Sequence, residues 1–143
     1  MSFTIVLNSA NGTGNVYSKE YNIDWTATPA HSGKYKLNYT FCSSSIASIT
    51  NTCILININL GTYDKYTASA SNILISRSNS INVGYAFSMG SFMLADATAG
   101  LPVIIQRKPS NNTFTVYLTE LDGDNYTELN SGSYTLHLFF EAV

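Results

Sequence analysis

The strongest constraint on the fold is a ten-residue stretch, Ser32 to Phe41, in which large apolar residues alternate with polar ones. Its apolar positions, two residues apart, are Tyr35, Leu37, Tyr39 and Phe41. Because successive side chains of a β-strand point to opposite faces, this period predicts a strand that is buried on one face only. Such strands are typical of antiparallel sheets whose apolar face is covered by a second sheet.

The stretch from Ser131 to Phe140 repeats this pattern near the other end of the chain. Both stretches begin with Ser-Gly, and Tyr134, Leu136 and Phe140 take the places of the corresponding Tyr, Leu and Phe in the first. A Ser-Gly pair is typical of the end of a turn. The repetition therefore predicts two similar strands in one β-sandwich.

Strand-like segments fill most of the remaining chain, and none shows a sustained helical period. They cover residues 3–7, 16–25, 52–60, 72–76, 81–88, 92–95, 101–107 and 111–121, and the segment 16–25 is either one strand or two short ones. We expect residues 61–71 to form an exposed excursion and Asp122 to Asn125 to form a turn. The spacing predicts one domain over residues 1–143, an all-β antiparallel β-sandwich built as a single jelly roll of about eight strands.

The composition favours self-association and argues against two other classes of partner. Charged residues make up only 11% of the 143 residues, so the polar surface must consist largely of Ser, Thr and Asn, which pack together without desolvating ions. The seven basic residues are scattered and the net charge is −2, whereas nucleic-acid binding needs a concentrated basic face. No segment approaches the ~18 apolar residues of a membrane span.

The sequence contains no motif that indicates an enzyme. Only two histidines are available as a catalytic base, His31 in a turn and His137 on the polar face of a predicted strand. Asp122 and Asp124 flank Gly123, but the spacing of a calcium loop is absent, so a hairpin turn is the better interpretation. We therefore predict no catalytic residue, no metal site and no cofactor.

Two cysteines, Cys42 and Cys53, lie near the end of one predicted strand and the start of another. A hairpin-like approach of these strands would allow a disulfide. The other interpretation is a pair of small, half-buried thiols. The sequence leaves both open.

Four residues are candidates for an interface or ligand contact. Tyr63 and Tyr66 fall in the predicted excursion, where exposed aromatic rings can anchor a protein interface or stack on a sugar. Lys34 and Lys36 lie on the polar face of the opening strand, where they either solubilise that face or meet an acidic patch on a neighbour.

Four segments together resemble the small jelly-roll proteins of large double-stranded DNA viruses and their virophages, in particular minor capsid or penton-like proteins. They are FTIVLNS at 3–9, Trp25 after an aromatic strand, SGKYKLNYTF at 32–41 and NNTFTVYL at 111–118. The resemblance implies an icosahedral capsid component that is made in the host cytoplasm, is located in the virion, and contacts copies of itself and other capsid proteins. It implies no catalytic or binding residue.

Two functional hypotheses follow. The first is a non-enzymatic virion structural protein that assembles through symmetric contacts, because low charge and self-compatible surfaces suit repeated contacts between identical copies. The second is a surface-displayed β-sandwich that binds a host carbohydrate or receptor, and it rests on Tyr63, Tyr66 and the Asn-rich loops.

Overall fold

The computed structural model describes residues 2–27, 35–46, 49–59, 63–78, 81–95, 103–105, 113–129 and 132–142. Within these ranges the chain is almost entirely β. The strands are β1 Ser2–Asn8, β2 Ser18–Asn22, β3 Tyr35–Ser43, β4 Cys53–Ile58, β5 Tyr63–Ala68, β6 Ile73–Ser78, β7 Ile81–Ser88, β8 Met93–Ala95, β9 Val103–Ile105, β10 Thr113–Thr119 and β11 Tyr134–Ala142. Two short 3-10 helices, η1 Ser9–Asn11 and η2 Trp25–Ala27, follow β1 and β2.

Eight of these strands form two four-stranded antiparallel layers. One layer has the order β1-β11-β3-β8, and the other has the order β2-β10-β4-β7. When the eight strands are ranked along the chain, these orders read 1-8-3-6 and 2-7-4-5. This is the strand order of a jelly roll, with each layer mixing strands from both halves of the chain. The predicted fold class is therefore confirmed.

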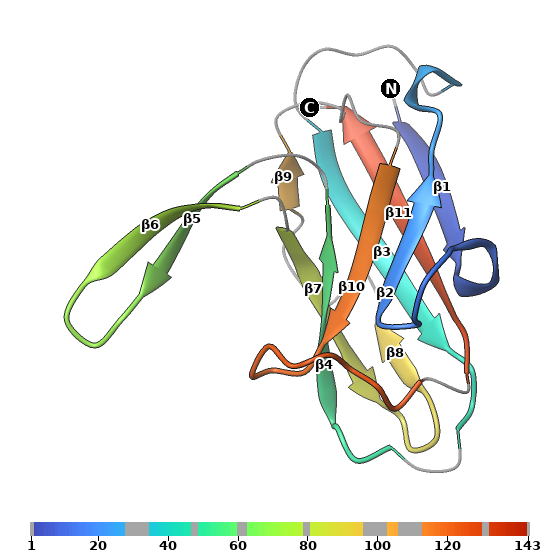
Figure 1. Ribbon diagram of the computed structural model, residues 1–143. Helices are drawn as coiled ribbons and strands as arrows, with labels where there is room; N and C mark the ends of the chain where they lie inside the picture. Colours follow the sequence, from blue (N-terminus) through green and yellow to red (C-terminus); the bar gives the residue numbers. More distant parts are fainter. Residues whose placement is uncertain are drawn as a thin grey trace.

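The short strand β8 joins the two layers along one side, because it pairs with β3 of one layer and β7 of the other. The strands consequently form one continuous path that curves into a nearly closed barrel (Figure 1). β9 pairs with β3 at Tyr35–Leu37, whereas β8 pairs with it at Phe41–Cys42. The two short strands thus lie along different parts of β3.

The two strands with the repeated Ser-Gly pattern are direct neighbours. β3 and β11 run antiparallel over nine residue pairs, from Tyr35 opposite Ala142 to Ser43 opposite Tyr134. Their apolar faces point into the sandwich, where the side chains of Leu37 and Phe140 are fully buried. The alternation seen in the sequence therefore produces the centre of one layer.

Aromatic side chains hold the layers together at one end of the core. Trp25, in η2, packs edge-on against Phe114 of β10 and Phe140 of β11, with ring centroids 6.2 and 6.0 Å away. Across the open side between β1 and β2, the hydroxyl of Tyr21 donates a hydrogen bond to that of Tyr134 at 3.3 Å. These contacts bridge strands that share no backbone ladder.

The predicted excursion at residues 61–71 is partly wrong. Residues 63–68 form β5, which pairs with β6 in a separate two-stranded sheet inserted between β4 and β7. This hairpin stands out from the sandwich (Figure 1). The sequence gives no strand signal for β5, because TYDKYTA does not alternate between apolar and polar residues.

Two smaller predictions also differ from the structure. The strand expected over residues 16–25 is limited to β2, so Trp25 reaches the core from a 3-10 turn. In the segment after the predicted Asp122–Asn125 turn, Tyr126 and Leu129 are completely buried although they lie outside any strand. Among the described residues no helix is long and apolar enough to cross a membrane.

Candidate functional site

The most distinctive surface is an apolar row that crosses four strands on the outside of the sandwich. Backbone pairing places Cys42 of β3 opposite Leu94 of β8, Leu94 opposite Phe87 of β7, and Phe87 opposite Cys53 of β4. Tyr85 lies two residues before Phe87 on the same strand, with ring centroids 6.5 Å apart and planes inclined by 30°. None of these side chains is charged.

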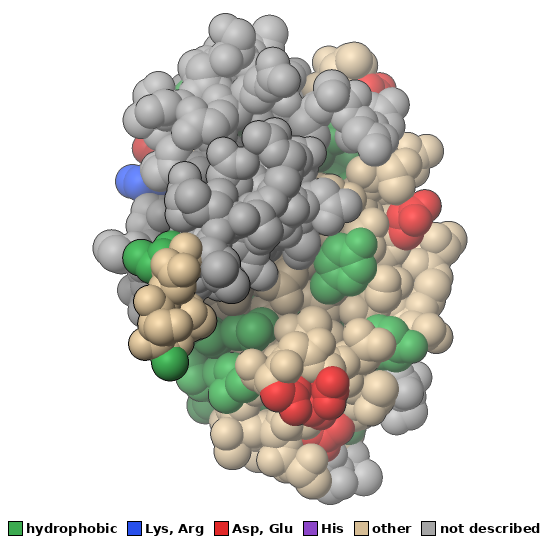
Figure 2. Space-filling model, turned by 60° about the vertical axis from the view of Figure 1, so that its left-hand side comes forward, with side chains coloured by type: hydrophobic (Ala, Val, Ile, Leu, Met, Phe, Trp, Pro, Cys, Tyr) green, Lys and Arg blue, Asp and Glu red, His purple; other side chains and the backbone are tan. Residues whose placement is uncertain are grey.

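We define the apolar patch as the exposed large apolar side chains of this row, Tyr85, Phe87 and Leu94, together with the neighbouring Met89. The exposed fractions of Tyr85, Phe87 and Leu94 are 47%, 51% and 38%. Met89, in the turn after β7, is 57% exposed. Only three other large apolar side chains of the described chain are exposed, so the patch is a concentration and not a scatter. Figure 2 shows hydrophobic side chains gathered on this side, next to a group of acidic ones.

A β-bulge explains why Tyr85 and Phe87 face outward. The pairing of β7 with β4 shifts by one residue, since Ile56 is opposite Gly84 and Asn57 is opposite Asn82. Val83 is the extra residue, and it is buried. A shift of one residue exchanges the two faces of a strand, so the aromatic residues beyond the bulge point away from the core. Without the bulge, the same face of β7 would carry Val83, Tyr85 and Phe87.

Tyr39 of β3 holds this bulge in place. Its hydroxyl accepts a hydrogen bond from the Tyr85 N–H at 2.9 Å and donates one to the Tyr85 carbonyl at 2.8 Å. The Tyr39 hydroxyl therefore makes the two hydrogen bonds to the Tyr85 backbone that a neighbouring strand would otherwise make. Gly84 is required beside it, because a Cβ at this position would overlap the Tyr39 hydroxyl.

The structure resolves the question of the two cysteines. Cys42 and Cys53 are both free, and they lie at the two ends of the apolar row with β8 and β7 between them. Three strand spacings of ~4.8 Å separate their backbones by about 14 Å, far beyond the reach of a disulfide. Cys42 is exposed, whereas partial burial raises the pKa of the Cys53 thiol. The thiols therefore contribute to the apolar surface and not to a cross-link.

Of the four predicted contact residues, three lie in the described part of the chain, and none of these three is on a strand that carries an exposed residue of the apolar patch. Tyr63 and Tyr66 belong to β5 of the projecting hairpin, and Lys34 lies outside the described residues. Lys36 is half-buried on the outer face of β3, where its cross-strand neighbour is Glu141 of β11. Sequence reasoning missed Tyr85, Phe87 and Leu94, because their outward orientation depends on the bulge and on pairing between strands.

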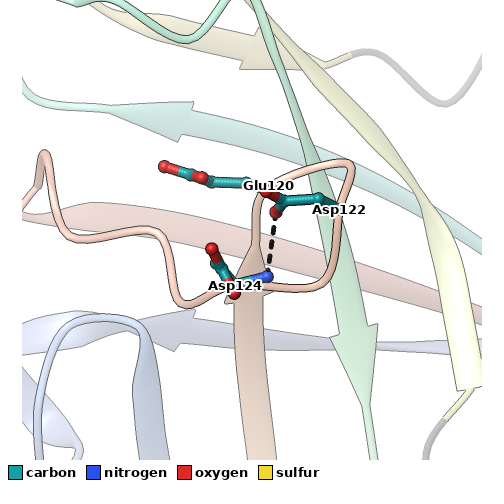
Figure 3. A group of neighbouring side chains, drawn as sticks. All are labelled: Glu120, Asp122 and Asp124. Atoms are coloured by element: carbon teal, nitrogen blue, oxygen red, sulfur yellow. Dashed lines mark hydrogen bonds between the residues drawn. The ribbon is translucent and has the colours of Figure 1, made fainter.

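The predicted turn after β10 brings three carboxylates together. Glu120, Asp122 and Asp124 place their oxygen atoms within 4.8 Å of one another (Figure 3). The Asp122 side chain accepts a hydrogen bond from the Asp124 N–H at 3.0 Å, and Gly123 donates to the Glu120 carbonyl. Carboxylate oxygens at such spacing suit a hard cation such as Ca²⁺. The Asp122 carboxylate and the Glu120 backbone carbonyl close the turn through these two hydrogen bonds, and a turn at this position was predicted from the sequence.

This acidic turn is attached to the strand that carries Cys53. The Glu128 carboxylate accepts hydrogen bonds from the Thr50 and Asn51 N–H groups at 2.7 and 2.8 Å, and the Asn51 side chain donates to both Glu120 and Glu128. Burial acts to raise the pKa of Glu128, but these hydrogen bonds outweigh it and keep the pKa below its ordinary value. An ionised Glu128 thus fixes the acidic turn near the start of β4.

A polar pocket of about 410 Å³ lies on the open side of the barrel. It is lined by Ser9, Ala10, Gly14, Asn15, Val16, Lys19, Gly132 and Ser133. Lys19 is the only charged residue among them, and the Ser9 hydroxyl is already used, since it accepts a hydrogen bond from the Tyr134 N–H at 2.9 Å. The pocket is thus polar and weakly basic.

Of the two histidines, His31 lies outside the described residues. His137 is half-buried on the outer face of β11, with Val6 and Thr40 as cross-strand neighbours. No known protein family matches the sequence, and no characterised protein is significantly similar to it.

Proposed function

We propose that this protein is a non-enzymatic virion structural protein, a minor capsid or penton-like component that assembles through symmetric contacts with copies of itself and with other capsid proteins. It is made in the host cytoplasm and functions in the virion. The observation that carries the proposal is the uncharged, exposed apolar patch on the outside of a jelly roll. Contiguous apolar surface of this kind marks a site of protein association.

The charge content of the chain supports the same proposal. Only 11% of the residues are charged, so two copies can bring their surfaces together while desolvating few ions. The centre of a protein interface is typically depleted of charge and enriched in aromatic residues and Met, which is the composition of the apolar patch. Identical copies related by a symmetry axis would bury this surface repeatedly.

The test is whether the purified protein assembles. Native mass spectrometry and sedimentation over a wide range of concentration measure its mass, and negative-stain electron microscopy detects closed particles. We expect oligomers whose mass rises with concentration, and we expect the protein in purified particles of its source virus. A strict monomer at every concentration, absent from virions, would exclude the proposed function.

The second candidate is a surface-displayed β-sandwich that binds a host carbohydrate or receptor. It is favoured by the half-exposed rings of Tyr85 and Phe87, whose similar inclination provides an aromatic platform on which a sugar ring can stack. A glycan array tests this function, with Tyr85→Ala and Tyr63→Ala as variants. A signal that disappears in either variant supports it, and an array without any signal counts against it.

A further inference from the structure

Lys19 of β2 lies on the face of its strand that turns towards the inside of the sandwich. It precedes the buried Tyr21 by two residues, and residues two apart on a strand share a face. Its cross-strand neighbour on β10 is Val116, which is fully buried. The half-buried Lys19 side chain makes no hydrogen bond or ion pair with any described residue. An inward-facing ammonium group without a partner in the chain indicates an anion that comes from outside it.

Lys19 lines the polar pocket of about 410 Å³ at the open side of the barrel. The residues that line this pocket include no acidic side chain that could balance the charge of Lys19. Glu20 is adjacent in the sequence, but it is exposed and lies on the opposite face of β2. Pockets that bind small molecules typically enclose ~300–1,000 Å³. The pocket is therefore large enough for a small ligand and offers it one uncompensated positive charge.

The other polar side chains of the pocket are neutral. The hydroxyl of the buried Ser9 is used only as an acceptor, for the Tyr134 N–H, so its own proton remains available to a ligand within the described structure. The Asn15 side chain donates to the Tyr17 hydroxyl at 3.0 Å, which leaves its carbonyl oxygen able to accept a hydrogen bond. Ser133 adds an exposed hydroxyl. Such groups suit the hydroxyl groups of a ligand.

Hydrogen bonds within the chain hold the walls of the pocket in place. Thr13 and Glu20 exchange two backbone hydrogen bonds of 2.9 Å, which close the loop that carries Asn15. On the opposite wall, the Ser133 N–H donates to the Ser44 hydroxyl at 2.9 Å. A Cβ atom at Gly132 would lie 2.7 Å from the same hydroxyl, so this close approach requires glycine. The pocket is thus formed before a ligand enters, which lowers the entropic cost of binding.

We propose that this pocket binds a small hydroxylated carboxylic acid, the chemical class to which sugar acids belong. A carboxylate carries a single negative charge, which the Lys19 ammonium group balances. A phosphate monoester carries a charge of about −1.5 to −2 at pH 7, so part of its charge would stay uncompensated. The neutral hydroxyl and amide groups then hydrogen-bond with the hydroxyl groups of the ligand. The site shares no residue with the apolar patch, and the inference depends on neither proposed function.

The first experiment compares four ligands by two-dimensional NMR titration of the wild-type protein. They are glucuronate, glucose, acetate and inorganic phosphate. We expect glucuronate to shift the amide signals of Asn15, Lys19 and Ser133, and to bind about tenfold or more tightly than each of the others. Glucose lacks the carboxylate, acetate lacks the hydroxyl groups, and phosphate carries the larger charge.

Three results of this titration would overturn the inference. The first is that no pocket signal shifts with glucuronate. The second is that acetate or phosphate binds as tightly as glucuronate, which would show a general anion site. The third is that glucuronate shifts only the signals around Tyr85 and Phe87. That result would place the sugar on the aromatic platform, and it would support the second candidate function while excluding the pocket.

The second experiment removes the charge of the pocket. Lys19→Gln keeps most of the length of the side chain, and we expect glucuronate to bind about tenfold more weakly while glucose binding stays the same. Lys36→Gln is the matched control, because Lys36 is also half-buried but lies on the outer face of β3. The NMR spectrum of each variant shows whether it is folded. Wild-type affinity in Lys19→Gln, or an equal loss in both variants, would overturn the inference.

A third titration distinguishes two sources of such a ligand. The methyl glycoside of glucuronate is blocked at its anomeric carbon, as an acidic sugar at the end of a glycan is. If it binds as tightly as free glucuronate, the pocket accepts the end of a glycan. If only free glucuronate binds, the ligand is a free sugar acid. Both results support the proposed class, whereas a failure of both ligands to bind would overturn it.

Discussion

At the scale of single residues, buried polar groups differ in whether their hydrogen bonds are made. The hydroxyl of Ser43 is buried and accepts a hydrogen bond from the Met93 N–H at 2.8 Å, which ties β3 to β8. The hydroxyl of Tyr126 is equally buried but has no hydrogen-bond partner in the part of the chain that the structure describes. Burial and the nearby charges of Glu128 and Glu120 raise the pKa of Tyr126 to about 12. Its ring fills the core, whereas the burial of its unpaired hydroxyl lowers the free energy of unfolding.

Two tyrosine-to-phenylalanine substitutions should therefore differ in their effect on stability. Tyr126→Phe removes an unpaired buried hydroxyl, so we expect the free energy of unfolding to stay the same or to rise by up to about 1 kcal/mol. Tyr134→Phe removes the acceptor of the Tyr21 hydrogen bond and should lower it by about 1 kcal/mol. Urea denaturation of both variants measures the difference, and a loss of stability in Tyr126→Phe would show that its hydroxyl is paired.

At the scale of strands, the sequence predicts best where one face is buried along the whole strand. β11 keeps a strict two-residue period and β3 departs from it only at the half-buried Tyr39, so nearly all of their buried residues and their similarity were predictable from SGKYKLNYTF and SGSYTLHLFF. β7 does not keep it, because the bulge at Val83 exchanges its two faces. A bulge depends on a partner strand and on Tyr39 from elsewhere in the chain. The apolar patch that it creates therefore has no signal in the local sequence.

The bulge of β7 predicts a strong coupling between Gly84 and Tyr39. Gly84→Ala should cost about 1–3 kcal/mol, because its methyl group overlaps both the hydroxyl and the ring carbons Cζ and Cε1 of Tyr39. Tyr39→Phe should cost a similar amount, since it removes both hydrogen bonds to the Tyr85 backbone. Residues in contact are not additive, so the double variant should lose less stability than the sum of the two single losses. Thermal or urea denaturation of the four proteins measures the coupling, and additive losses would contradict this account of the bulge.

At the scale of the whole molecule, the outer surface is divided into regions of different chemistry. The apolar patch lies at the Cys42 end of β3, and Lys36 lies six residues away along the same strand, a distance of about 20 Å. Lys36 faces Glu141 of its own chain, so its charge is already balanced across the β3–β11 pair. We therefore expect that the proposed contact with a neighbour does not require Lys36.

Lys36→Glu should therefore leave self-association unchanged while slightly destabilising the fold. The substitution sets two carboxylates opposite each other on β3 and β11, which we expect to cost a few tenths of a kcal/mol, about the worth of one exposed cross-strand pair. Lys36→Glu combined with Glu141→Lys restores opposite charges and should recover the loss. Denaturation measures the stability, and sedimentation measures the association of the same samples. The contrary result is a weaker association in Lys36→Glu that persists in the charge-swapped variant. It would show that the contact requires Lys36 itself and not the charge balance between Lys36 and Glu141, and it would place a neighbour on this face.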